Sequence, residues 1–345
     1  MAARLLAAAV AVFAAPPSVS AGTKPEVAIF TSVCGAEAAN SAVPMLTSLL
    51  FHRGASIDLH VMVDGKARRA LRSRFKPAQY AGLEAHVIKA DTDQYSALLE
   101  SALPQKIRGS ASTCSLLPAI APMVIHTDKA LYVGGGVTFN DDVSKLYAHF
   151  EAFSSTDVLG AVAEQSGWYG QQYTSGIHDG VVLMNLKRMR KLGWVEFVKR
   201  TLTASTLPRL GERPVQDMLS SIAALQSPTA SVYSIPCQWN VQLVKGSLCD
   251  RTDTAAEKNC KCEQPKVLSS GDVAVADGTH PLRGMFSFWK TPPAEVNTYK
   301  FDSANKPDAK TVLTQNTVSN AKSSLAEQEG CTPGWAGEDC DECAP

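Results

Sequence analysis

The stretch Lys129-Ala-Leu-Tyr-Val-Gly-Gly-Gly-Val-Thr-Phe-Asn140 decides the fold. Two short apolar, β-prone runs, 131–133 and 137–139, flank three consecutive glycines, Gly134, Gly135 and Gly136. Apolar runs without polar alternation are typical of a strand that is buried on both faces of a sheet. Glycine at the end of such a strand permits unusual backbone angles and the close approach of a ligand. Because ligands of open parallel sheets bind at the carboxyl ends of strands, the glycines mark a predicted ligand site.

Strand-like runs alternate with helical patterns on both sides of this stretch. The expected strands span residues 27–31, 59–63, 83–88, 158–162, 180–185, 231–235 and 273–276. Helical patterns follow the first strand through Leu46 and Leu50 and continue at 66–75, 143–150, 186–201 and 216–225. Residues 113–123 are interpreted as an apolar helix or loop, 236–240 as a loop, and 249–270 as an irregular insertion tied by disulfides. The alternation predicts an α/β fold with a mainly parallel central sheet and helices on both faces.

Composition limits the classes of protein to consider. The chain has 345 residues, of which 45% are hydrophobic and 19% charged, enough for one large domain and an appendage. The formal net charge is zero and no basic block occurs, so a nucleic-acid partner is not expected.

The N-terminal residues 1–21 have the pattern of a secretory signal. Arg4 precedes the apolar run 5–15, and Val19-Ser20-Ala21 offers a small-residue cleavage site. The alternative is a short type II membrane anchor, which would give weak membrane association through the N-terminus, although about 11 apolar residues are too few to span a bilayer about 30 Å thick. Under either interpretation, the rest of the chain is expected in the lumen of the Golgi or endoplasmic reticulum, or outside the cell as a secreted protein.

Nine cysteines suit a lumenal protein, where thiols can pair, and the odd number leaves at least one free or bound to another chain. Cys237 and Cys249 are close in sequence and form the expected pair in the body of the protein. Asp141 and Asp142 precede a helical pattern, so they are interpreted as helix-capping residues, with a role as metal ligands as the alternative.

The glycine stretch resembles the strand Leu-Tyr-Leu-Asp-x-Asp-Val of family 8 glycosyltransferases. Other blocks resemble the glucoside xylosyltransferase branch of that family, in the same order along the chain. These blocks are Gly180-Val-Val-Leu-Met-Asn-Leu-Lys-Arg-Met-Arg190, Gln216-Asp217-Met-Leu219, Pro236-Cys-Gln-Trp-Asn240 and His280-x-x-Arg283-Gly284. Five blocks in order across residues 26–290 are specific together, although none is specific alone.

The resemblance implies a GT-A fold, a UDP-sugar donor with UDP-xylose first, and an acceptor that is a glycan on an EGF-like repeat or another O-glucosylated acceptor. In the family the two Asp residues hold a divalent metal such as Mn²⁺, and here their positions are Gly134 and Gly136. The first Asp of the family's Asp-Gln-Asp motif is Val215, and Pro281 replaces a glycine after the metal-binding His280. The sequence thus departs from the family at positions that take part in catalysis or metal binding, while the blocks around these positions match the family.

The same resemblance implies roles for individual residues. Gln216, Asp217, His178 and Asp179 are the catalytic candidates. The donor-binding candidates are Ser32, Gly35, Gly134, Gly135, Gly136, Arg283 and Gly284. Trp239 and Asn240 are acceptor candidates, and His280 is the metal candidate. Structural alternatives exist for several: helix capping for Gln216 and Asp217, a strand-end hydrogen-bond pair for His178 and Asp179, and a buried core side chain for Trp239.

The C-terminal segment Cys331-Thr-Pro-Gly-Trp-Ala-Gly-Glu-Asp-Cys340 resembles the last loop of an EGF-like module, which implies a Cys331–Cys340 bridge. The expected organisation is therefore a signal or anchor at 1–21, a glycosyltransferase domain at 22–295, a polar linker at 296–329 and a partial EGF-like tail at 330–345. Two functions compete. One is glycosyl transfer that is slow or independent of metal, and the other is a catalytically inactive transferase that binds glycans or EGF-like partners.

Overall fold

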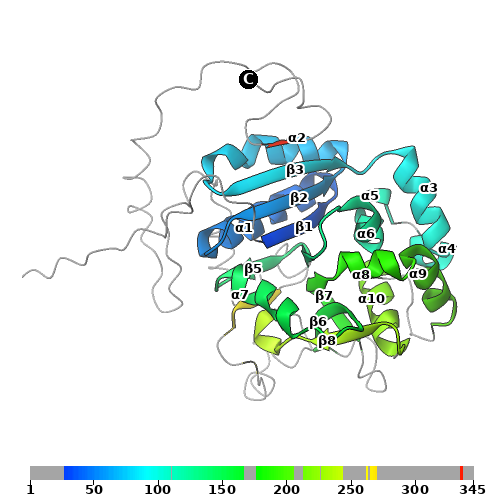
Figure 1. Cartoon of the computed structure of the whole chain (residues 1–345). Helices are drawn as coiled ribbons and strands as arrows, with labels where there is room; N and C mark the ends of the chain where they lie inside the picture. Colours follow the sequence, from blue (N-terminus) through cyan, green and yellow to red (C-terminus); the bar gives the residue numbers. More distant parts are fainter. Residues whose placement is uncertain are drawn as a thin grey trace, which may run out of the picture.

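The computed structural model describes residues 27–109, 111–166, 176–205, 213–225, 227–243, 262, 265–269 and 335–336. Its main element is an eight-stranded sheet (Figure 1). In spatial order the strands are β11 (Trp335–Ala336), β3 (Leu83–Lys89), β2 (Ile57–Val63), β1 (Val27–Val33), β4 (Ala130–Val133), β7 (Ile177–Met184), β6 (Asp157–Ala163) and β8 (Ser231–Ser234).

Neighbouring strands of this sheet are parallel except at β7, which is antiparallel to both β4 and β6. The mainly parallel α/β sheet is as predicted. The reversal at β7 has a consequence for the site, because it brings the first residues of β7 beside the last residues of β4, where Val133 is the partner of Val181.

A second, three-stranded sheet contains β5 (Val137–Phe139), β10 (Val267–Ser269) and β9 (Val241–Gln242). The two apolar runs around the glycines are thus separate strands in separate sheets. A turn at Gly135 and Gly136 separates them, and Gly136 has a φ of 70°, a conformation that favours glycine. The expectation that 249–270 is entirely irregular is wrong at β10, whose apolar side chains are buried against β5.

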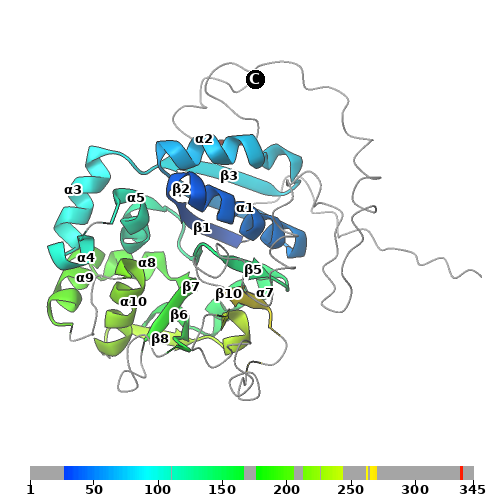
Figure 2. The ribbon, with the colours of Figure 1, turned by 180° about the vertical axis from the view of Figure 1, so that it is seen from behind.

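Helices cover both faces of the main sheet. One face packs against α1 (Gly35–His52) and α2 (Gly65–Arg74), and Figure 2 shows α1 lying across β1 and β2. The helices on the other side are α3 (Asp93–Ala102), α4 (Gln105–Arg108), α5 (Thr113–Leu116), α6 (Ala121–Val124), α8 (Leu186–Lys191), α9 (Trp194–Thr203) and α10 (Pro214–Leu225). Alternate side chains of one strand separate onto the two cores, as with Ile29 toward α1 and Phe30 toward α3.

Local sequence explains where the helices differ from expectation. The pattern at 186–201 forms two helices, because Gly193 lies between them with a φ of 66°. Residues 113–123 fall in the short turns α5, η2 (Leu117–Ile120) and α6. The capping interpretation of Asp142 is confirmed, since its carboxylate accepts the amide of Ser144 at 2.9 Å at the start of α7 (Val143–Tyr147). Two 3-10 turns, η1 (Pro77–Gln79) and η3 (Ala148–Ala152), complete this part of the chain.

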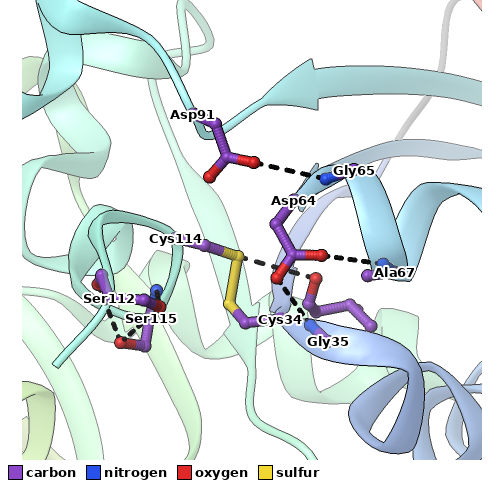
Figure 3. The surroundings of a disulfide bond; sticks show 10 residues. Cys34, Gly35, Asp64, Gly65, Ala67, Asp91, Ser112, Cys114 and Ser115 are labelled. Carbon is purple, nitrogen blue, oxygen red and sulfur yellow. Dashed lines mark hydrogen bonds between the residues drawn. A yellow bond between two sulfur atoms is a disulfide. The ribbon is translucent and has the colours of Figure 1, made fainter.

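Two disulfides hold chain segments together at the edge where parallel strands end. Cys34, directly after β1, is bonded to Cys114 in α5, 80 residues away (Figure 3). Cys237, in the 3-10 turn η4 (Cys237–Trp239), is bonded to Cys262, 25 residues away. The predicted Cys237–Cys249 pair is therefore wrong. The pairing of β10 with β9 brings the segment after Cys262 back to η4, and sequence proximity did not reveal this. Cys249, Cys331 and Cys340 lie outside the described residues.

The two disulfides close loops of different length, which predicts different contributions to stability. Replacing either pair with alanine should lower the free energy of unfolding by about 2–5 kcal/mol. By the chain-entropy relation, removing the disulfide that closes the 80-residue loop should lower the free energy of unfolding by about 1 kcal/mol more than removing the one that closes the 25-residue loop. Urea denaturation of C34A/C114A and C237A/C262A measures the difference, and a larger loss from the shorter loop would contradict the chain-entropy account.

Candidate functional site

The carboxyl end of β4 meets the amino end of β7 by direct backbone contact. The amide of Gly134 donates to the carbonyl of Gly180 at 2.9 Å. A Cβ at Gly134 would lie 3.1 Å from the carbonyl oxygen of Asp179, closer than most side chains tolerate. Gly134 is buried and Gly135 is exposed. The glycines therefore stand at a strand's carboxyl end, as predicted, and the absence of side chains allows the two strands to approach there.

A buried polar chain lies behind this contact. The Ser269 hydroxyl donates to Asn240 Oδ1 at 2.6 Å, and Asn240 Nδ2 lies 3.1 Å from His178 Nδ1. His178 Nδ1 also accepts the amide of Gly180 at 3.0 Å. Because a backbone amide can only donate, Nδ1 is the acceptor in its contact with Gly180. Both of these contacts of His178 Nδ1 lie within this buried chain, which fits the strand-end hydrogen-bond role of His178.

Gly180 leaves room for that chain. A Cβ there would lie 2.3 Å from Ser269 Oγ, 2.9 Å from Asn240 Oδ1 and 3.0 Å from His178 Nδ1. All three contacts are shorter than or at the limit of normal packing, so the network and a side chain at position 180 exclude each other. The glycine is required here by space alone.

Gln216 and Asp217 belong to a second polar group at the start of α10. Gln216 Nε2 donates to Glu164, and Gln216 Oε1 accepts from Arg213 Nη1 at 3.3 Å. Asp217 is fully buried and accepts the amide of Arg213 at 3.1 Å, which caps the helix. The capping contact of Asp217 is thus observed, and its role in the site stays a prediction. Glu164 and Arg213 had no recognisable motif in the sequence.

Two glutamines join these groups. The backbone amide of Gln165 donates to Gln242 Oε1 at 2.7 Å, and the backbone amide of Gln242 donates to Gln165 Oε1 at 3.0 Å. Gln165 Nε2 also donates to the Asn240 carbonyl at 3.1 Å. Since Gln165 follows Glu164 directly, the ends of β6 and β9, the start of α10 and the His178 chain form one connected polar network.

Ser32 and Gly35 lie at the end of β1, the side from which the disulfide runs to α5. The amide of Gly35 donates to Asp64 Oδ2 at 2.7 Å, and Asp64 Oδ1 accepts the amide of Ala67 at 2.7 Å (Figure 3). Gly35 has a φ of 85°, and a Cβ there would meet no atom within 4 Å. The turn after β1 is therefore held by Asp64, and its glycine is required by conformation rather than by space.

Trp239 is 1% exposed and packs in the core on the α1 side of the sheet. Lys266 Nζ lies 4.6 Å from its ring centroid. This arrangement matches the structural alternative for Trp239, while Asn240 beside it is part of the polar chain.

The glycine site does not fit a divalent metal held by an Asp-x-Asp pair. Hard cations require oxygen ligands, and Gly134 and Gly136 carry no side chain that could supply one. Within the described residues, a group of three metal-ligand side chains whose ligand atoms lie close together is found elsewhere, on β2 and β3. The predicted residues His280, Arg283 and Gly284 lie outside the described residues.

Comparison with known sequences finds glycosyltransferases. No protein-family profile matches the chain. It is 28% identical over 250 residues to xylosyl- and glucuronyltransferase LARGE2s of Gallus gallus, covering 68% of this chain and 33% of that protein. It is 28% identical over 222 residues to LARGE1 of Danio rerio, covering 61% of this chain and 29% of that protein. The chain thus spans about a third of the length of the curated relatives it matches.

Solved structures with the same architecture are also glycosyltransferases. Mouse xyloside xylosyltransferase 1 superposes with a TM-score of 0.56 at 17% identity, covering 72% of this chain and 98% of that one. GlyE of Streptococcus pneumoniae has a TM-score of 0.56 at 15% identity, covering 79% and 62%. Galactosyltransferase LgtC, solved with donor and acceptor sugar analogues, has a TM-score of 0.50 at 18% identity, covering 76% and 95%. The fold is therefore GT-A. Among the described residues no helix combines the length and apolar character needed to cross a bilayer.

The space at Gly180 gives a testable prediction. Gly180→Ala should lower the free energy of unfolding by about 1–3 kcal/mol, because the new methyl group overlaps the buried network. Adding Ser269→Ala removes the atom at 2.3 Å, so the double variant should be less destabilised than the sum of the single ones. Urea denaturation of both singles and the double completes the cycle. Gly65→Ala, where the nearest atom to the new Cβ is at 3.9 Å, is the matched control. Simple additivity would contradict the steric account.

Proposed function

We propose that this chain is a glycosyltransferase of the secretory pathway that transfers a sugar from a UDP-sugar to a glycan acceptor. UDP-xylose and a glucose-bearing EGF-like repeat are the proposed donor and acceptor, from the resemblance to glucoside xylosyltransferases. The observation that carries the proposal is the connected polar network at the carboxyl end of β4, which joins Gln216, Asn240 and His178 in a GT-A fold. The sequence relatives named xylosyl- and glucuronyltransferases support the same reaction class.

The charge of the leaving group decides how this transfer would work. The acceptor hydroxyl oxygen forms a bond to the anomeric carbon while the bond from that carbon to the diphosphate breaks. UDP leaves with added negative charge, and the hydroxyl proton passes to the departing diphosphate. A divalent ion normally stabilises that charge by several kcal/mol. With glycine at both Asp positions, we propose that the transfer proceeds without a metal at this strand end. Arg213, hydrogen-bonded to Gln216, is a cation that the described network offers for the diphosphate.

Gln216 is the residue on which the proposal is tested. Its amide is held from both ends, by Glu164 and Arg213, and only 2% of it is exposed before any ligand binds. A fixed amide of this kind can orient a sugar or a cation without changing its own position, which is the form of preorganisation that catalysis uses.

We expect hydrolysis or transfer with a panel of UDP-sugars not to require added Mn²⁺ and to fall at least about a hundredfold in Gln216→Ala. Gln79→Ala, at an exposed glutamine of η1, is the matched control and should keep full activity. Activity that requires added Mn²⁺ would contradict the metal-independent proposal. UDP binding by calorimetry without any turnover would instead favour the second candidate, an inactive transferase that binds glycans or EGF-like partners.

Restoring the Asp pair is a further test. The backbone conformation and packing at these two positions should make both substitutions destabilising. Asp at position 134 brings Cβ to 3.1 Å from the Asp179 carbonyl oxygen, and Asp at 136 must adopt a φ near 70°. We expect Gly134→Asp with Gly136→Asp to lower the melting temperature and to gain Mn²⁺ binding measurable by calorimetry. Tight Mn²⁺-dependent UDP binding by the unchanged protein would mean that other carboxylates hold the metal.

A further inference from the structure

Four metal-ligand side chains lie on one face of β2 and β3. In the parallel pairing of these strands, Asp58 is the partner of Glu84 and His60 is the partner of His86. Because side chains alternate between the faces of a strand, these four residues share one face. An Asp-x-His pair on β2 thus lies in register with a Glu-x-His pair on β3.

The ligand atoms are spaced as they would be around one ion. Asp58 Oδ1 lies 3.1 Å from His60 Nε2 and 3.1 Å from His86 Nε2, and the three ligand atoms lie within 4.8 Å of one another. In a tetrahedral zinc site with bonds of about 2.0–2.1 Å, neighbouring ligand atoms are about 3.3 Å apart. The two distances from the carboxylate oxygen to the imidazoles are thus within a few tenths of an ångström of the spacing in such a site.

Two of these ligand atoms approach each other without ordinary hydrogen-bond geometry. Asp58 Oδ1 and His60 Nε2 are buried atoms, and neither makes a hydrogen bond of ordinary geometry although they lie 3.1 Å apart. The two imidazole rings stack at a centroid distance of 4.8 Å and an angle of 18°, so their Nε2 atoms are on adjacent, nearly parallel planes. A buried acceptor and a buried ring nitrogen that meet only in this poor geometry are incompletely satisfied, and an ion between them would satisfy both.

The site has an open side from which an ion and a fourth ligand can reach it. His60 and Asp58 are 15% and 17% exposed, His86 is 30% exposed, and Glu84 is 57% exposed. Glu84 Oε1 lies 3.2 Å from His86 Nε2, close enough to turn toward the ion as the fourth ligand. Water is the other candidate for that position.

The cluster is separate from the transferase network. His60 is level with Phe30 on β1, which is in turn level with Tyr132 on β4. Gly134 lies two residues beyond Tyr132, and β1 stands between the two sites. A ligand at the end of β4 and an ion at His60 would therefore occupy different positions on the sheet.

We infer that Asp58, His60 and His86 form a binding site for one divalent transition-metal ion of the zinc class, with Glu84 or water as the fourth ligand. Two imidazoles and carboxylate oxygen match the donors that Zn²⁺ accepts, whereas Mg²⁺ and Ca²⁺ prefer oxygen alone. An ion at this position would join β2 to β3 across the sheet and stabilise the folded chain.

The rival explanation is a cluster of ion pairs. Burial alone would raise the pKa of Asp58, but the contacts with His60 and His86 outweigh burial and hold that pKa below its ordinary value. Contact with Asp58 raises the pKa of His86. A cluster held only by a protonated His86 would stabilise the protein fully below the ordinary histidine pKa. That contribution would be lost as the pH rises through the raised folded-state pKa, with no response to zinc.

Titration of the chelator-treated full-length protein with Zn²⁺ tests the inference. We expect one saturable site, an increase in melting temperature on adding Zn²⁺, and at least about tenfold weaker binding in His60→Gln and His86→Gln. His126→Gln, at an exposed histidine outside the cluster, is the matched control and should bind as the unchanged protein does. Absence of saturable binding, or equal binding by the His60, His86 and His126 variants, would overturn the proposal.

X-ray absorption of the zinc-loaded unchanged protein keeps the test independent of whether variants fold. The expected first shell contains two imidazole nitrogens and one or two oxygens at about 2.0–2.2 Å. A shell of water oxygens alone, or one containing sulfur, would overturn the assignment. The proposed transferase activity does not enter either measurement, so failure of one proposal leaves the other unaffected.

Discussion

The contact between Gly134 and Gly180 is the constraint on which the site depends. A backbone hydrogen bond of 2.9 Å joins the end of β4 to the start of the antiparallel β7. A side chain at Gly134 would press on the Asp179 carbonyl of the neighbouring strand, and a side chain at Gly180 would overlap the chain of Ser269, Asn240 and His178. The space that the two glycines leave is filled by hydrogen-bonded polar atoms, so the end of β4 is both tightly packed and polar.

That contact also determines how the second sheet is attached. β5 leaves β4 through the turn at Gly136, pairs with β10, and β10 pairs with β9. Ser269 at the end of β10 donates to Asn240 before β9, and Asn240 in turn contacts His178 on the main sheet. Gln165 and Gln242 close the same junction from β6. Buried amides with both donors and acceptors satisfied are rigid, so this junction can hold a ligand-binding surface in one conformation.

Sequence patterns predicted the positions of strands better than strand directions, disulfide pairing or hydrogen-bond partners. The strands at 27–33, 57–63 and 83–89 were expected within two residues of their observed bounds, because each contains several β-prone apolar residues. The direction of β7 was not predictable, since a fully buried run such as Val181–Met184 has the same pattern in parallel and antiparallel sheets. The bond from Cys237 to Cys262 rather than Cys249 followed from strand pairing, which distance along the chain does not encode. Of the candidate site residues, His178, Asn240, Gln216 and Asp217 came together, whereas their partners Glu164 and Gln242 carried no motif.

The cluster on β2 and β3 also depends on strand pairing that the sequence pattern does not reveal. Alternation within each strand already puts Asp58 with His60, and Glu84 with His86, on a single face. Whether the two pairs lie side by side depends on the register, and a shift of one residue would send one pair to the helix-covered face with α1 and α2. The register observed here matches histidine with histidine and carboxylate with carboxylate. Polar side chains in the interior strands of a parallel sheet are costly, and this set is tolerated where the covering helices leave its face partly open. The same opening gives an ion access to the imidazole nitrogens.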